Sequence, residues 1–290
     1  MSNFIPDQLI EAVPYIIRFQ GKMFVVKMGG SFMEDKDAMN ALYEDIVVLS
    51  LLGIKIIIVH GGGKAINEKL MHYGIESHFI GGFRYTDSKT MDIVEMTLSG
   101  SVGKEIVFNL QQAGLKAVGL NGKDGHLMKA EPKRIETEEG LVDLGFVGEV
   151  EAIQTELLEL LVAQNYIPVV SPIGYDDFGN TYNINADSAA AAVAGAIGAE
   201  KLILMTDVDG IYGEFPKKET LIKMMDLSES YALCDEGRLE GGMIPKLECA
   251  IAAIEGGVHS VHMINGSWKH SLLTEIFSNE GIGTMITRRV

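Results

Sequence analysis

Two lysines stand where lysine is uncommon, and each lies beside a glycine pair. Lys27 lies within the apolar run Met23 to Met28, directly before Gly29-Gly30. Lys246 follows Gly241-Gly242 near the start of an expected helix, where the positive end of the helix dipole disfavours a cation unless an anion is close. A solvent-facing lysine is the simpler explanation at either position, because lysine is seldom buried without a partner. Together with the glycines, the pair indicates a site that binds phosphate.

Glycine clusters follow two of the early strands. Gly29-Gly30 comes after the first, and Gly61-Gly62-Gly63 comes after the β-branched run Ile56 to Val59. Ligands of open α/β sheets bind at the carboxyl ends of strands, where glycines and helix N-termini bring N–H groups close to phosphate. Tight turns alone are the other explanation. The common nucleotide motifs do not match: Ile58 occupies the first glycine position of a Walker A loop ending at Lys64, and a dinucleotide fingerprint would lack its third glycine.

Charge and composition narrow the classes of partner. The 290 residues carry a formal net charge of −16, and such a surface repels nucleic acid and anionic membranes. No segment reaches the about 20 apolar residues needed to span a bilayer, and the N-terminus does not resemble a signal peptide. Cys234 and Cys249 form no C-x-x-C pair and are expected to be reduced thiols, as in a reducing cytosol. We therefore expect a cytoplasmic location and a small-molecule substrate.

The elements that must position these residues alternate between strands and helices. Apolar runs predict strands at residues 23–28, 56–59, 116–120, 167–171, 202–206, 261–264 and 285–287, with hairpins within 122–150. Helical spacing predicts helices at residues 39–49, from 64, 91–113, 157–161, 187–197, 245–255 and 270–277. This alternation predicts an α/β fold in which a mainly parallel sheet is covered by helices on both faces, a three-layer α/β/α sandwich. The turn-rich segment Gly174 to Asn180 suggests a boundary between two lobes near residue 180.

Motifs spread along the chain resemble the amino-acid kinase family when they are taken together. In order, they are Val26-Lys27-Met28-Gly29-Gly30-Ser31, Val59-His60-Gly61-Gly62-Gly63, Gly82-Phe83-Arg84, Asn183-Ile184-Asn185-Ala186-Asp187, Thr206-Asp207-Val208-Asp209-Gly210 and Gly241-Gly242-Met243-Ile244-Pro245-Lys246. Within the family, the residues around Arg84, Gly119 to Gly125, Gly145 to Gly148 and Asn183 are most similar to the acetylglutamate kinases. Gly103, where asparagine is expected, and Asn121, where serine or threonine is usual, depart from that pattern.

The resemblance implies a reaction and a division of the chain. MgATP and N-acetyl-L-glutamate would give the γ-acyl phosphate and ADP, an early step of arginine biosynthesis. An N-terminal helix at residues 1–20 would precede an acyl-substrate lobe at 21–180 and a nucleotide-binding lobe at 181–290. The attacking carboxylate has an ordinary pKa of about 4.3 and needs no general base, so catalysis would depend on positioning and charge neutralisation.

Two other functions stay open at this point. A kinase of the acetylaminoadipate type would act on a substrate only one methylene longer. A non-catalytic amino-acid or nucleotide sensor belongs to a different class, and the retention of Lys27, Asp187 and Lys246 together argues against it.

The resemblance also implies roles for the phosphoryl-transfer residues. Lys27 and Lys246 would flank the transferring phosphoryl group, Asp187 would hold both lysines in place, and the Gly30 N–H would bind phosphoryl oxygens. Helix N-terminal capping is the alternative role for Asp187 and for Asn183.

The remaining site residues would bind the two substrates. The implied substrate-binding residues are Gly62, Gly63, Arg84 and Asn183. The guanidinium of Arg84 would form two hydrogen bonds with the α-carboxylate of the substrate. The implied nucleotide-binding residues are Asp207, Asp209, Gly210, Ile211, Tyr212, Gly241, Gly242 and Met243. We expect Mg²⁺ to be held mainly by ATP phosphates and water, so no protein ligand to the metal is predicted.

An apolar stripe precedes the first strand. Leu9, Ile10, Val13, Ile16 and Ile17 recur at helical spacing, which predicts either a helix packed on its own subunit or an arm that links subunits. The arm and the tail Glu280 to Thr284 resemble the arginine-inhibited acetylglutamate kinases, which form rings of three dimers. The resemblance thus implies a homo-oligomer, a dimer or a hexamer, and an arginine site. The residues implied for that site are Tyr15, Lys201, Glu280 and Gly283.

Overall fold

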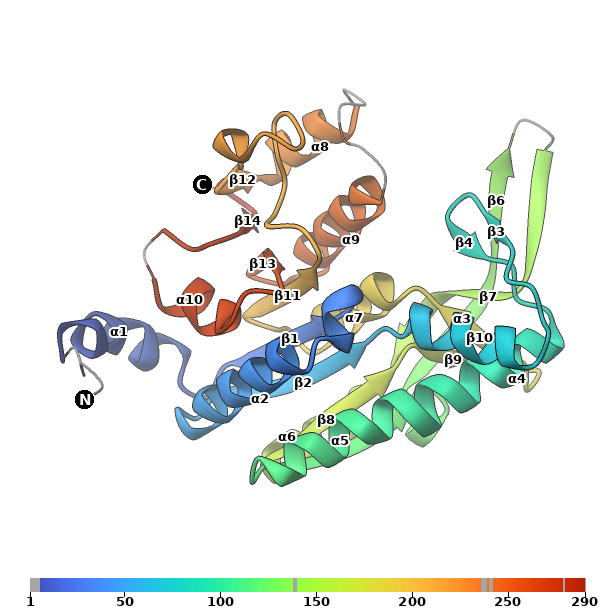
Figure 1. The fold of residues 1–290 in the computed structure, drawn as a ribbon, viewed down its shortest axis with the longest axis horizontal. Coiled ribbons are helices and arrows are strands. Elements are labelled where there is room, and N and C mark those ends of the chain that lie inside the picture. The colour runs from blue at the N-terminus through green and yellow to red at the C-terminus, as the bar shows by residue number, and fades with distance from the viewer. Residues whose placement is uncertain (1–5, 138–139, 236–238, 240–241, 279, 290) are drawn as a thin grey trace.

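The computed structural model describes residues 6–137, 140–235, 239, 242–278 and 280–289 (Figure 1). An eight-stranded sheet crosses the molecule in the order β12-β14-β13-β11-β1-β2-β8-β5, and every pairing in it is parallel except β13 with β14. Its strands are β1 (Met23–Met28), β2 (Lys55–His60), β5 (Lys116–Asn121), β8 (Tyr166–Ser171), β11 (Lys201–Thr206), β12 (Met224–Asp226), β13 (Ser260–Asn265) and β14 (Thr284–Thr287). The predicted mainly parallel sheet is confirmed.

Alternate residues of the central strands enter two separate cores. Val25 and Ile57 belong to one apolar cluster, whereas Val26 and Ile58 belong to the other, because successive side chains of a strand point to opposite faces. The first core is covered by α6 (Glu156–Ala163), α7 (Ala186–Ala196), α8 (Leu227–Asp235) and α9 (Met243–Glu255). The second is covered by α1 (Pro6–Phe19), α2 (Lys36–Leu51), α5 (Gly103–Gln112) and α10 (Ser271–Phe277). The three-layer α/β/α architecture is therefore confirmed.

A smaller set of strands lies at one end of the main sheet (Figure 1). β6 (Met128–Thr137), β7 (Gly140–Ile153), β9 (Ile173–Tyr175) and β10 (Thr181–Ile184) form a small closed barrel, and β3 (Phe79–Ile80) pairs with β4 (Phe83–Arg84). α3 (Gly63–His72) and α4 (Ser88–Glu95) pack beside them around a third apolar cluster. In place of the several hairpins predicted within 122–150, the structure has one long hairpin, formed by β6 and β7.

One predicted helix contains an irregular turn. Between α4 and α5 the chain continues as a π-helix over Met96–Val102, and such segments are frequent at functional sites. Short 3₁₀ helices occur at Ser31–Glu34, Asp124–His126 and Lys218–Thr220.

The two expected lobes share the main sheet, because β1 pairs with β11 along its length. β10 lies just after the expected boundary but pairs with β7 and β9. The assignment of the acyl substrate to residues 21–180 and of the nucleotide to 181–290 stays a prediction. Within the described chain, every helix is too short or too polar to cross a bilayer.

Candidate active site

The carboxyl ends of neighbouring parallel strands bring the two glycine clusters together. β1 lies between β2 and β11, so Gly29-Gly30, Gly61 to Gly63 and Asp207 all emerge at the same edge of the sheet. The N-terminus of α7 lies at this edge too, since a Cβ on Gly61 would be 3.9 Å from the Ala186 Cβ.

Three charged side chains from distant parts of the sequence meet at this edge. Lys27 Nζ lies 2.7 Å from Asp187 Oδ1, and Lys246 Nζ lies 2.6 Å from Asp187 Oδ2. Lys27 and Asp187 are buried, and the Lys246 side chain is partly exposed. We call these three residues the lysine clamp. Two ammonium groups share one carboxylate, which leaves one positive charge in excess.

Burial and neighbouring charges act in opposite directions on the lysine clamp. Burial lowers the pKa of Lys27, and Asp187 only partly restores it. Burial raises the pKa of Asp187, but Lys27 and Lys246 outweigh it and hold that pKa below its ordinary value. Asp187 is therefore ionised at neutral pH, and an anion that approached the clamp would favour the charged form of Lys27.

Local capping leaves the Asp187 carboxylate free to contact the lysines. Asn185 is the N-cap of α7, and its Oδ1 accepts hydrogen bonds from Asp187 N at 2.8 Å and Ser188 N at 3.1 Å. The alternative role predicted for Asn183 and Asp187, capping this helix, is thus filled by Asn185.

The loop after β1 is held against the end of β11. Asp207 Oδ1 accepts hydrogen bonds from Ser31 N at 2.7 Å, Ser31 Oγ at 3.0 Å and Phe32 N at 3.3 Å. Gly30 has φ 114° and ψ −179°, and a Cβ there would lie 2.6 Å from Asp207 Oδ1. A Cβ on Gly29 would collide with the Lys27 ammonium group. Both glycines are thus required by conformation or close packing.

A cavity of about 210 Å³ contains the four predicted substrate-binding residues. It is lined by Gly61, Gly62, Gly63, Ile66, Gly82, Phe83, Arg84, Leu98, Val147, Pro172, Asn183, Ile184, Asn185 and Ala186. The Arg84 guanidinium donates to Asn67 Oδ1 at 2.6 Å and to Gly63 O at 3.2 Å, and it also contacts Ser77 Oγ. Asn183 Nδ2 donates to Thr86 Oγ1 at 3.4 Å. These bonds fix a cation and an amide at the wall of the cavity.

A second cavity, of about 430 Å³, is lined by Lys246 and by part of the predicted nucleotide-binding set. Its lining residues are Thr206, Asp207, Val208, Gly210, Tyr212, Phe215, Leu239, Gly242, Met243 and Lys246. The apolar members Phe215 and Leu239 belong to no motif, so the sequence does not predict them as part of this site. Mainly apolar walls suit a nucleoside base and sugar.

Two predicted nucleotide-binding residues point elsewhere, and a third lies outside the described residues. Ile211 is fully buried in the apolar core. The Asp209 carboxylate accepts hydrogen bonds from Asn265 Nδ2 at 2.8 Å and Tyr212 Oη at 2.9 Å. The structure thus uses Asp209 for internal bonding and Ile211 for packing. Gly241 lies outside the described residues.

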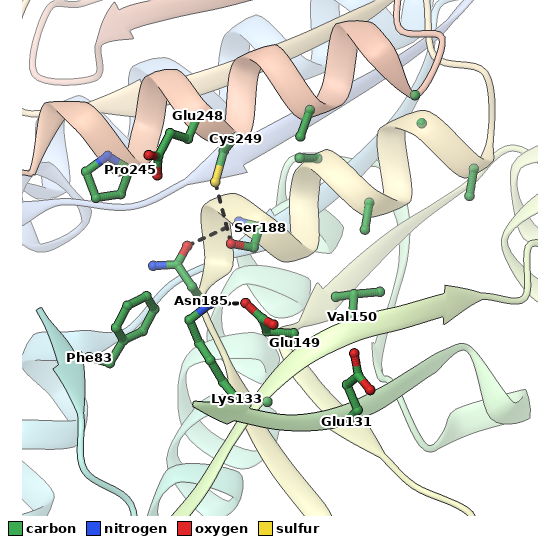
Figure 2. Close-up of a pocket in the computed structure, with 17 residues that line it drawn as sticks. Phe83, Glu131, Lys133, Glu149, Val150, Asn185, Ser188, Pro245, Glu248 and Cys249 are labelled. Atoms are coloured by element: carbon green, nitrogen blue, oxygen red, sulfur yellow. Dashed lines mark hydrogen bonds and ion pairs between the residues drawn. The ribbon is translucent and has the colours of Figure 1, made fainter. Parts of the chain in front are cut away.

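A larger cavity, of about 650 Å³, lies between α7, α9 and the strands β6 and β7 (Figure 2). Glu131, Glu149 and Glu248 line it, and Lys133 is paired with Glu149. Ser188 Oγ and Cys249 Sγ are 3.5 Å apart and join the two helices. The excess of carboxylates disfavours the binding of phosphate in this cavity.

The described residues contain no cluster of three or more histidine, cysteine or carboxylate side chains suited to a metal ion. The donors facing the two smaller cavities are mostly cations and N–H groups, which suit phosphate oxygens better than they suit a divalent cation.

Two of the residues predicted for an arginine site belong to a buried polar network. Lys201 Nζ contacts His262 Nε2 at 2.7 Å and Ser260 Oγ at 3.1 Å, and His262 Nδ1 lies 2.7 Å from Glu275 Oε1. Glu275 Oε2 accepts a hydrogen bond from Gly283 N at 3.0 Å.

The other two lie nearer the surface. The Tyr15 ring stacks on Phe19, whose ring centroid is 5.1 Å from Lys201 Nζ. Glu280 is exposed. The structure therefore links Tyr15 to Lys201 through Phe19, and Lys201 to Gly283 through His262 and Glu275.

The fold and the site define a class of protein. A parallel sheet whose carboxyl edge carries two glycine loops, two lysines paired with one carboxylate, and two cavities is typical of an enzyme that transfers a phosphoryl group between two small molecules. Residues 22–265 match the model of the Amino acid kinase family. The chain belongs to that family, as the sequence motifs predicted.

Individual proteins show the same relationship. The acetylglutamate kinase of Methanocaldococcus jannaschii is 51% identical over 97% of this chain and 95% of its own length. The structure is similar to an N-acetylglutamate synthase from Neisseria gonorrhoeae complexed with coenzyme A and N-acetyl-glutamate, with a TM-score of 0.85 and 28% identity over 99% of this chain. The same synthase complexed with coenzyme A and L-arginine gives a TM-score of 0.82 at 26% identity. This chain spans only 64% of the first synthase chain and 66% of the second.

Proposed function

We propose that this chain transfers the γ-phosphoryl group of ATP to the side-chain carboxylate of N-acetyl-L-glutamate, a step of arginine biosynthesis. The kinase relative that is 51% identical supports this substrate. The observation that carries the proposal is the lysine clamp, in which Lys27 and Lys246 share one carboxylate between a cavity lined by Arg84 and a cavity lined by Lys246 itself.

The excess positive charge of the clamp addresses the main barrier of the reaction. An ionised carboxylate must approach a phosphoryl group that is itself anionic, so like charges oppose the attack. Lys27 and Lys246 offset this repulsion from both sides of the transferring group, while Asp187 holds both in position and favours the charged form of Lys27. No general base is required, because the nucleophile is already ionised at neutral pH.

The cavity walls orient the two reactants. Arg84 and Asn183 bind the amino-acid end of N-acetylglutamate, which directs its side-chain carboxylate toward the clamp. The N–H groups of Gly30, Gly62 and Gly63 bind phosphoryl or carboxylate oxygens, and the hydrogen bonds to Asp207 hold the loop that carries Gly30. The apolar cavity around Met243 takes the nucleoside. Mg²⁺, bound with ATP through its phosphates and water, would neutralise further phosphate charge.

A hydroxamate assay for acyl phosphate tests the proposed reaction. Purified protein with MgATP is offered N-acetylglutamate, glutamate, aspartate and N-acetylaminoadipate in parallel. We expect acyl phosphate chiefly with N-acetylglutamate. Equal or greater turnover of N-acetylaminoadipate would move the proposal to that substrate, and no acyl phosphate with any acceptor would overturn it.

We further propose that α1 links subunits of a homo-oligomer. Ile10, Val13 and Ile17 are 65%, 43% and 71% exposed, and their i, i+3, i+7 spacing places them on one face of the helix. An apolar stripe of this kind favours a partner helix of a second copy. Light scattering of the intact chain and of Ile10→Glu/Ile17→Glu tests this: the double variant should give a smaller assembly with wild-type turnover.

We also propose that arginine inhibits the enzyme at a site formed by Tyr15, Lys201, Glu280 and Gly283. The proposed location is the cytoplasm. Activity that stays flat as arginine rises would contradict the inhibition. The free thiols of Cys234 and Cys249 support a reducing compartment.

A further inference from the structure

A buried histidine stands behind the second glycine cluster. His60 is the last residue of β2 and has 0% of its surface exposed. Its Nδ1 lies 2.8 Å from Gly61 O, and its Nε2 lies 3.0 Å from Ser171 Oγ. The reaction proposed above uses neither His60 nor Ser171 directly.

The partners of the ring determine where its proton lies. A carbonyl oxygen can only accept, so Nδ1 carries the hydrogen and donates it to Gly61 O. Burial lowers the pKa of His60 to about 4, so the ring is neutral at pH 7 and Nε2 is an acceptor. The Ser171 hydroxyl therefore donates to Nε2. The result is a directed chain of hydrogen bonds from Ser171 through His60 to the Gly61 carbonyl.

That carbonyl shares a peptide unit with the N–H of Gly62. The peptide unit is planar, so a hydrogen bond that fixes the Gly61 carbonyl also fixes the direction of the Gly62 N–H. Hydrogen bonds in a chain polarise one another in a low-dielectric interior, which makes the Gly62 N–H a stronger donor. Gly62 lines the cavity assigned to the acyl substrate.

We infer that His60 and Ser171 are positioning residues that orient and polarise the Gly62 N–H toward the oxygens of the reacting carboxylate and phosphoryl group. This inference rests on the proposed function, since it assigns a task to the same site. It explains why a buried imidazole is placed directly before the glycines, where an apolar residue would fill the core without needing polar partners.

The packing around the ring supports a fixed geometry. A Cβ on Gly103 would lie 3.0 Å from His60 Nε2 and 3.3 Å from Ser171 Oγ. Glycine at 103 therefore leaves just enough room for the pair. Gly103 is also the position at which the sequence departs from the asparagine expected by resemblance.

Two substitutions at His60 separate positioning from packing. The amide nitrogen of His60→Asn takes the place of Nδ1 and can still donate to Gly61 O, whereas that of His60→Gln takes the place of Nε2 and cannot. We expect His60→Gln to lower kcat about tenfold, a fraction of the loss of a whole charge-stabilising donor, with KM for ATP unchanged. His60→Asn should stay within about threefold of wild type. His72→Gln, on the exposed surface of α3, is the matched control and should be neutral.

NMR of the intact protein gives a readout that does not need turnover. The imidazole ¹⁵N shifts of His60 should show a hydrogen on Nδ1 and none on Nε2, and Ser171→Ala should shift the Gly62 amide resonance. An Nε2–H tautomer, normal turnover in His60→Gln, or equal losses in the Asn and Gln variants would overturn the inference. A wild-type chain that forms no acyl phosphate would overturn the proposed function alone, because the tautomer and the Gly62 shift would still decide whether the hydrogen-bond chain exists.

Discussion

Lys27 and Lys201 are both buried on neighbouring strands of the main sheet, but the charges around them differ. Lys27 on β1 shares Asp187 with Lys246, which lines the second cavity. Lys201 on β11 is enclosed by His262 and Ser260 under the ring of Phe19, and Glu275 supplies the balancing charge through His262.

The difference is one of charge balance. In the Lys201 network, one cation and one carboxylate bracket a neutral imidazole, and burial lowers the pKa of Lys201 to about 8. In the lysine clamp, two cations face one carboxylate. A protein that only needed a stable core would not keep an unbalanced buried charge. The imbalance supports the proposal that the clamp binds an anion, whereas the balanced charges of the Lys201 network are consistent with a structural or regulatory role.

Removing the shared carboxylate should have the largest effect. Asp187→Ala leaves Lys27 buried without a counter-charge, and breaking a buried pair in this way typically costs about 3–5 kcal/mol. We expect the free energy of unfolding, measured with urea, to fall by that amount and turnover to be lost. Asp177→Ala, which breaks an exposed pair with Lys129, should change stability little. Wild-type stability in Asp187→Ala would contradict the clamp.

Removing the more exposed lysine should separate catalysis from stability. In Lys246→Ala, Asp187 still pairs with Lys27, so the fold should persist. We expect kcat to fall about 10²-fold or more, the scale of losing one charge-stabilising donor, with urea unfolding near that of wild type. Near-normal turnover in the hydroxamate assay would exclude this role for Lys246.

A substitution in the Lys201 network should instead lower stability and leave catalysis nearly unchanged. Glu275→Gln weakens the contact with His262 and the bonds from Ile282 N and Gly283 N, which should lower the free energy of unfolding by about 1–3 kcal/mol. In the absence of arginine, kcat should stay within about twofold of wild type. A large loss of kcat with unchanged stability would erase the distinction between the two regions.

The most gradual effect concerns pH. The pKa of Lys201 is about 8 in the folded chain and 10.5 for an ordinary lysine, so between these values the unfolded chain binds more protons. Stability should therefore rise with pH across this window, by at most about 1.4 kcal/mol per pH unit. The difference in unfolding free energy between wild type and Lys201→Met, measured from pH 7 to 10.5, isolates this contribution. A difference that falls with pH would contradict it.

The sequence predicted residue types better than it predicted contacts. Lys27, Asp187 and Lys246 were singled out from motifs, but their meeting depends on α7 and α9 both beginning at the edge where β1 ends. Asp209 and Ile211 flank Gly210, which lines the second cavity, but neither of them lines it. Residues that are neighbours in sequence can face different surroundings, so a motif does not show which of its side chains reach a cavity. Phe215 and Leu239 could not be found because apolar residues resemble core residues until the cavity is known. The π-helical turn at Met96–Val102 could not be predicted, because its apolar residues have the same spacing as those of an α-helix.

The most direct test is a crystal structure of the protein with ADP, Mg²⁺, aluminium fluoride and N-acetylglutamate. The planar aluminium fluoride mimics the transferring phosphoryl group. We expect Lys27 Nζ and Lys246 Nζ each to lie about 3 Å from one of its fluorine atoms. An anion bound elsewhere, with both ammonium groups still contacting only Asp187, would contradict the account.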